Sequence, residues 1–160
     1  MLAAGENGLG AVRSLAKAGV RVLAVAEWPN DIPLLSRFPS RKIFVRTPEA
    51  MDPDRTLLDA LHSIPESRPV LIPTSDRLVA FMVRNRADLA LRFDFVLPEG
   101  DLAARLLDKT LQAELIAGIG GIPLPKTVSA LPASAAQLKE ALPFPMIVKP
   151  RSAALRPHLR

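Results

Sequence analysis

Apolar and polar positions alternate along the first part of the chain in short blocks. Between residues 9 and 16 the apolar side chains recur at helical spacing, whereas residues 20–26 form a nearly continuous apolar run. The first pattern predicts a helix with one buried face, and the second predicts a parallel strand that is covered on both faces. With the apolar residues 2–4 as a first short strand, the chain is expected to begin with a strand–helix–strand unit.

The same alternation continues through a polar loop expected at residues 27–41. Strands are expected at residues 42–46 and 70–72, and helices at residues 55–63 and 76–90. Short apolar strands that alternate with amphipathic helices favour an open, mostly parallel sheet. The sequence therefore predicts an α/β fold.

The pattern changes after Pro98, where we place a domain boundary. Helices are expected at residues 102–107, 111–119 and 133–142, and strands at residues 124–128 and 146–149. Residues 99–160 are too few to form a self-sufficient second domain. Residues 153–160 form a basic tail with no readable period.

Composition narrows the function classes. The 160 residues contain no cysteine, which excludes disulfides, thiolate metal sites and cysteine nucleophiles and fits a reducing compartment. No apolar run reaches the roughly 18 residues that a membrane helix needs, so we expect a cytoplasmic protein without a membrane partner. The net charge of +5 is concentrated in the last ten residues, and the other charges alternate along helical faces, so we expect no nucleic-acid partner.

The segment Gly5-Glu6-Asn7-Gly8-Leu9-Gly10 follows the first expected strand. Glycines at such a position let backbone amides at a helix N-terminus approach an anion, which would make Gly5, Glu6 and Asn7 part of a binding site. The spacing differs from the dinucleotide fingerprint, although Glu27 follows the second strand where a ribose-binding acid is expected. The alternative is a glycine turn required for tight packing of helix against strand.

Two further groups of residues are candidates for ligand binding. Ser75 and Asp76 follow the strand at residues 70–72, where ligands gather in open α/β sheets, although either residue could instead cap the next helix. Lys149 ends an expected buried strand, and its ammonium would meet either a nucleotide phosphate or solvent. Lys109 begins a helical stretch. His62 and His158 lack metal-ligand spacing and are expected at the surface, so no metal ligand and no catalytic residue is assigned.

Five motifs in order resemble the ATP-grasp superfamily, in particular its carbamoyl-phosphate-synthetase-like, carboxylate-amine ligase branch. The resemblance covers the chain from Gly5 to about Ser152. The motifs are Ile72-Pro73-Thr74-Ser75-Asp76, Phe95-Val96-Leu97-Pro98, Leu107-Asp108-Lys109, Gly121-Ile122-Pro123-Leu124-Pro125-Lys126-Thr127 and Phe144-Pro145-Met146-Ile147-Val148-Lys149-Pro150.

The resemblance implies a domain organisation and a chemistry. Residues 1–98 would be a Rossmann-like pre-ATP-grasp domain that helps to form the acceptor-substrate site and that often dimerises. Residues 99–152 would be the start of an α+β ATP-grasp domain, in which Lys109 and Lys149 contact ATP. In the family, ATP and a carboxylate form an acyl phosphate that an amine attacks, with Mg²⁺ neutralising the phosphates.

The sequence also departs from the family pattern. No glycine follows Gly121 and no Asp or Glu follows Glu140, so the phosphate-covering loop and the late acidic metal ligands are missing. We therefore expect an amino-terminal fragment of a ligase that is inactive alone, with weak ATP and Mg²⁺ binding. The alternatives are a stand-alone Rossmann-like module for a nucleotide or metabolite, or an interaction protein that another chain completes.

Overall fold

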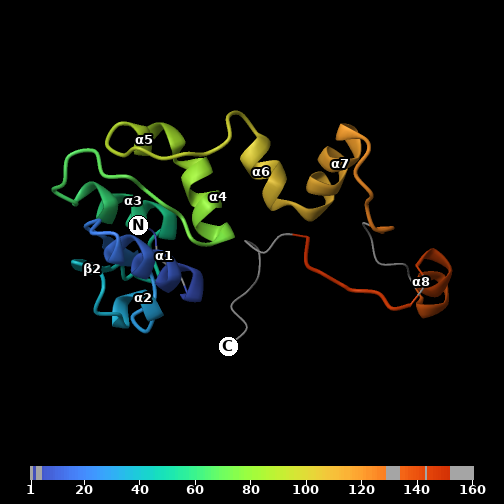
Figure 1. Cartoon of the computed structure of the whole chain (residues 1–160), viewed down its shortest axis with the longest axis horizontal. Coiled ribbons are helices and arrows are strands. Elements are labelled where there is room, and N and C mark those ends of the chain that lie inside the picture. Colours follow the sequence, from blue (N-terminus) through green and yellow to red (C-terminus); the bar gives the residue numbers. More distant parts are fainter. Residues whose placement is uncertain (1, 3–4, 129–133, 143, 152–160) are drawn as a thin grey trace. The chain divides into compact units, whose positions relative to one another are not determined.

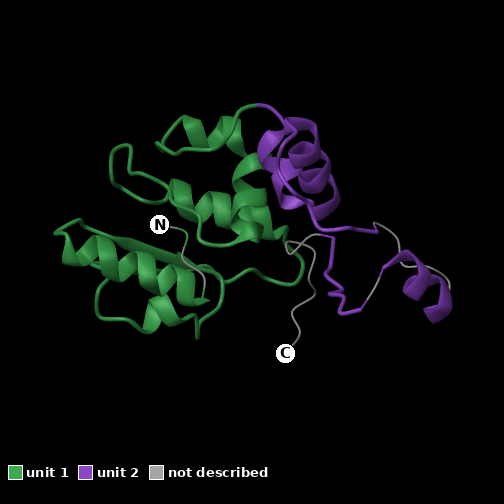
Figure 2. Ribbon diagram, turned by 45° about the vertical axis from the view of Figure 1, so that its right-hand side comes forward, with its two compact units in different colours: residues 1–99 green, residues 100–160 purple. Residues whose placement is uncertain are grey.

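The computed structural model describes residues 2, 5–128, 134–142 and 144–151. The chain divides into two compact units, unit 1 (residues 1–99) and unit 2 (residues 100–160), which are coloured green and purple in Figure 2, and its helices and strands are labelled in Figure 1. The division falls next to Pro98, where the sequence pattern changes. Helices and parallel strands together give the α/β class that the alternating pattern predicted.

The sheet of unit 1 is parallel. Strand β1 (Leu23–Ala26) pairs with strand β2 (Arg41–Phe44), with Leu23 opposite Arg41 and Ala26 opposite Phe44. Strand β1 is shorter than the predicted range 20–26, because it begins only at Leu23. Strand β2 is offset from the predicted range 42–46, because it begins at Arg41 and ends at Phe44. The offset arises because ladder hydrogen bonds, rather than apolar character, set where a strand begins and ends.

Isolated parallel bridges extend the pairing beyond β1. Leu2 bridges both Val25 and Pro73, and Val70 bridges Asp94. The Leu2 amide donates to the carbonyl of Ile72 at 2.9 Å. The pairing order across unit 1 is therefore residues 41–44, residues 23–26, Leu2, residues 70–73 and Asp94.

The described residues of unit 1 also form five helices. They are α1 (Gly5–Lys17), α2 (Ile32–Leu35), α3 (Pro53–His62), α4 (Asp76–Arg84) and α5 (Arg86–Ala90). Three expectations were wrong. The glycine-rich residues 5–10 lie inside α1 rather than in a turn before it, α2 interrupts the expected loop, and the helix expected at 76–90 breaks at Asn85. At the break, Asn85 leaves helical geometry with a φ of −107° and a ψ of 21°, and both its backbone amide and its side-chain amide donate to the Phe81 carbonyl.

The core of unit 1 lies on both faces of β1. Val25 belongs to a large cluster with Phe81, Met82 and Leu61, whereas Ala24 and Ala26 belong to a smaller cluster with Val12 and Leu34. Side chains alternate between the two faces of a strand. The continuous apolar run in β1 is thus explained by burial on both sides, as predicted.

Unit 2 is helical in its described residues. It contains α6 (Leu102–Leu107), α7 (Lys109–Ile119) and α8 (Ala135–Ala141). The strands expected at 124–128 and 146–149 are absent there, and Ile147 and Val148 are 80% and 67% exposed. A strand exists only when a neighbour satisfies its backbone groups, and these extended segments have no such neighbour among the described residues. Nowhere in the described ranges is a helix both long and apolar enough to cross a membrane.

Candidate functional site

The carboxyl ends of the parallel segments meet at one edge of unit 1. Strand β1 leads into Glu27, and residues 70–73 lead into Thr74, Ser75 and Asp76. The Thr74 hydroxyl donates to the Leu2 carbonyl at 3.0 Å, which joins neighbouring segments at this edge. Because ligands in open α/β sheets bind beyond the carboxyl ends of the strands, this edge is the candidate site of unit 1.

Ser75 is the N-cap of α4. Its hydroxyl accepts a hydrogen bond from the Leu78 amide at 3.3 Å, and its backbone is extended, as a cap requires. The capping alternative is therefore correct for Ser75. Asp76 is the first residue of α4, where its negative charge is stabilised by the helix dipole. Asp76 is half-buried at the edge.

Replacing Ser75 by alanine is expected to destabilise unit 1 by about 1 kcal/mol, because the Leu78 amide loses its acceptor. Urea unfolding followed by fluorescence measures this change. Ser75→Asn, which retains capping ability, is the matched control and is expected to recover most of the loss. Equal stability of the alanine variant and the original chain would show that the cap contributes nothing.

The amide of Gly5 at the start of α1 is already engaged by a carboxylate. It donates to Asp31 Oδ1 at 2.9 Å, and Gly5 has a φ of +55°, a conformation that glycine adopts without strain. Glu6 and Asn7, the other candidates in this segment, are exposed. Sequence reasoning missed Asp31, which is 26 residues away along the chain. The chain thus supplies its own anion at the position where the glycine segment suggested an external one.

Glu27 forms an ion pair with Arg77, a residue that sequence reasoning missed. Their side chains are 14% and 32% exposed, respectively. The Nη1 atom of Arg77 is buried and has no hydrogen-bond partner among the described residues. A partly buried pair interacts more strongly than an exposed one, because less water screens it. Glu27, considered above as a ribose-binding acid, instead fixes the guanidinium of Arg77 at the carboxyl edge.

Unit 2 brings together the segments that carry its two candidate lysines. The Lys109 amide donates to the carbonyl of Arg151 at 2.8 Å, and the Arg151 guanidinium pairs with the Asp108 carboxylate. Lys149 lies two residues before Arg151. Both lysines are exposed, and the prediction that Lys149 ends a buried strand was wrong because residues 146–149 form no strand.

Asp108 is the N-cap of α7 and the centre of this contact. Its Oδ1 accepts hydrogen bonds from the amides of Thr110 at 2.9 Å and Leu111 at 3.2 Å. Desolvation acts to raise the pKa of Asp108, but the hydrogen bonds from Leu111, Arg151 and Thr110 and the charge of Arg151 together lower it below the ordinary value. The ionised form of Asp108 is therefore the one that the folded unit stabilises.

Acidification is expected to release the contact between Asp108 and Arg151. Because the folded pKa is lowered, the stabilisation is fully present above the ordinary Asp value of about 3.9 and is lost as the pH falls through the lowered pKa. The amide NMR shifts of Thr110 and Leu111 measure this transition. Asp108→Asn should show no transition, whereas a midpoint above the ordinary Asp pKa in the original chain would contradict the assignment.

The histidines and acids give no metal site in the described part of the chain. No three His, Cys, Asp or Glu side chains gather there in a group that could hold a metal ion. His62 was expected at the surface but is half-buried, and its buried Nε2 atom has no hydrogen-bond partner in the part of the chain that the structure describes. His158 lies outside the described residues.

Comparisons of the chain with protein-family models, with curated proteins and with solved structures found no match.

Proposed function

We propose that the chain is the amino-terminal part of an ATP-dependent carboxylate-amine ligase of the ATP-grasp type. Unit 1 would contribute the acceptor-substrate site, and unit 2 would contribute two lysines to nucleotide binding. The observation that carries the proposal is the order of parallel pairings in unit 1. Numbered along the chain, the paired segments follow the order 3-2-1-4-5, which matches the start of the doubly wound, Rossmann-like arrangement.

The acceptor substrate would bind at the carboxyl edge of unit 1. Asp76 offers a carboxylate there for an ammonium or hydroxyl group, close along the chain to the cap Ser75. Gly5, Glu6 and Asn7 begin α1, which follows the central segment at Leu2. The Thr74 bond to the Leu2 carbonyl supports this grouping, because it ties the loop before α4 to the central segment.

The nucleotide would bind in unit 2 between the segments of Lys109 and Lys149. The support is the bond between the Lys109 amide and the Arg151 carbonyl, which holds the two segments together. Two exposed ammonium groups on adjoining segments attract a polyphosphate. Oxygen ligands for Mg²⁺ are a poorer fit, since no acidic cluster occurs in the described residues. No metal-dependent step is therefore assigned to these residues.

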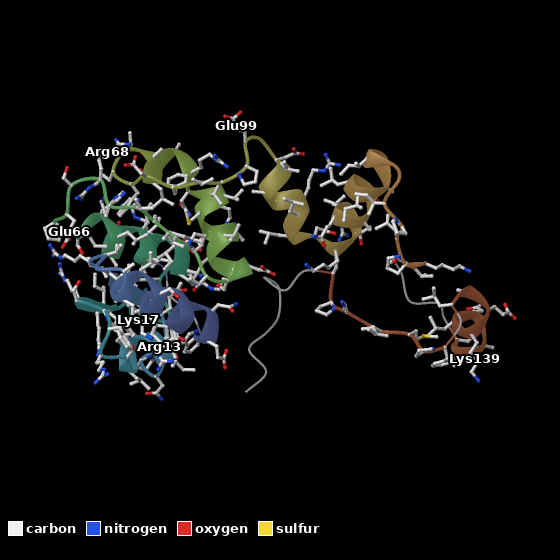
Figure 3. The ribbon with its side chains drawn as sticks, in the orientation of Figure 1. Arg13, Lys17, Glu66, Arg68, Glu99 and Lys139 are labelled. Carbon is white, nitrogen blue, oxygen red and sulfur yellow. The ribbon has the colours of Figure 1, made fainter. Side chains whose placement is uncertain are left out.

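ATP binding tests the proposal. On addition of ATP, the amide NMR signals of residues 109–111 and 149–151 are expected to shift, and Lys109→Ala or Lys149→Ala is expected to weaken binding by about tenfold. Lys139→Ala is the matched control, because Lys139 is an exposed lysine on α8 of the same unit (Figure 3). Binding that is unchanged in both variants would exclude this nucleotide site.

Ligase turnover is not expected from this chain alone, because the acidic metal ligands of the family pattern are missing from its sequence. A coupled assay for ADP release in the presence of ATP, Mg²⁺ and mixed small carboxylates and amines measures this. Release that is abolished by Lys149→Ala would show that the chain is a complete catalyst and would overturn this part of the proposal.

A further inference from the structure

A basic hollow on unit 1 is lined by none of the candidate site residues discussed so far. It has a volume of about 570 Å³ and lies beside α1 and the segment that follows α2. Arg13, Lys17 and Arg37 supply three positive charges to its lining. The lining is completed by Leu35, Ser36 and Phe38. Arg13 and Lys17 are in the second half of α1 (Figure 3), whereas the candidate residues of the carboxyl edge are at its start.

Phe38 organises two of these cations. The Cζ atoms of Arg13 and Arg37 are 5.8 Å and 5.6 Å from the centre of its ring, within the range of a cation–π contact. Phe38 is itself half-buried and packs against the smaller core cluster. The two guanidinium groups are therefore held by a ring that the core fixes in place.

The charges that line the basic hollow are all positive. Residues 7–26 and 32–48 contain seven Lys and Arg side chains and no Asp or Glu. These are Arg13, Lys17, Arg21, Arg37, Arg41, Lys42 and Arg46. Arg21 pairs with Glu66, but the described residues give no acidic partner to Arg13, Lys17 or Arg37. Arg13 and Lys17 are four residues apart on α1, and like charges at this spacing repel each other. A bound anion would relieve this repulsion.

We propose that the basic hollow binds a small molecule that carries a phosphate or diphosphate group. Guanidinium groups bind phosphate oxygens in a bidentate manner, and a nearby ammonium adds a point charge. The volume lies within the range of about 300–1,000 Å³ for small-molecule sites. A single-stranded nucleic acid fits less well, because such partners need aromatic faces for base stacking, and Phe38 is half-buried and engaged by two guanidinium groups.

Titration of the full chain with inorganic pyrophosphate, followed by NMR, tests this assignment. The amide signals of Arg13, Lys17 and residues 36–38 are expected to shift. The double variant Arg13→Ala/Arg37→Ala is expected to lose affinity by at least about tenfold, and Arg37→Lys by a smaller factor, because lysine keeps the charge but not the planar fork. Added salt should weaken binding in every case.

Arg55→Ala is the matched control, because Arg55 is an exposed arginine of α3 in the same unit and does not line the basic hollow. Its affinity for pyrophosphate should be unchanged. Equal affinity of the double variant and the original chain, with matching circular dichroism spectra, would overturn the proposal. A single-stranded RNA dodecamer tests the nucleic-acid alternative. The proposal would also be overturned if this RNA bound more tightly than pyrophosphate and if the double variant Arg41→Ala/Lys42→Ala lost affinity for the RNA, because the surface would then be a nucleic-acid interface.

Discussion

Replacing Phe81 by alanine is expected to destabilise unit 1 by about 3–5 kcal/mol. Phe81 is fully buried in the middle of α4 and is among the largest of the fully buried side chains. It belongs to the core cluster that also contains Leu57, Leu61 and Met82. Since small domains are stable by only about 5–15 kcal/mol, the variant would lose a large part of its folding free energy.

Urea unfolding measures this loss. The chain has a single tryptophan, Trp28, which lies in unit 1, so its fluorescence reports the unfolding of that unit. Leu91→Ala is the control: Leu91 is 74% exposed, and its loss is expected to change stability by less than about 0.5 kcal/mol. A Phe81→Ala variant as stable as Leu91→Ala would show that α4 does not pack against the core as described.

Limited proteolysis with trypsin is expected to cut unit 2 well before unit 1. Ala103 is the one buried hydrophobic residue among the described residues of unit 2, and α7 and α8 bury no residue. Several large apolar side chains between positions 119 and 148 are instead exposed. They are Ile119, Ile122, Leu124, Val128, Phe144, Ile147 and Val148. Segments with few buried contacts open at low free-energy cost, so proteases reach them first.

Exposed trypsin sites in both units allow their cleavage rates to be compared directly. Lys126 and Lys139 in unit 2 and Arg55 in α3 of unit 1 are all exposed. Mass spectrometry of timed samples is expected to show cleavage after the two lysines at least about tenfold faster than after Arg55. Equal rates at the three sites would mean that unit 2 is as well packed as unit 1.

Part of the candidate site could be predicted from the sequence. Ser75 and Asp76 were identified because polar residues that follow an apolar strand occur at the carboxyl edge of a parallel sheet. Whether Ser75 caps or binds could not be decided, because both roles need the same residue type at the same position. In the structure Ser75 caps α4 by accepting the hydrogen bond from the Leu78 amide.

The remaining features of the site could not be predicted because they join distant residues. Arg77 meets Glu27 across 50 positions, Gly5 meets Asp31 across 26, and Arg151 meets Asp108 across 43. No periodicity relates such pairs. The same holds for the basic hollow, in which the helix α1 and the segment after α2 contribute the three cations.

The sequence by itself determined the α/β class of this protein and the approximate positions of most of its described helices. Helices close their hydrogen bonds within one segment, so the helical spacing of apolar residues is enough to predict most of them. Only the tertiary structure decided which apolar runs become strands. Residues 23–26 find partners on both sides, whereas residues 124–128 and 146–149 find none in the described chain. The physical reason is that a strand satisfies its backbone groups through a neighbour that the local sequence does not specify.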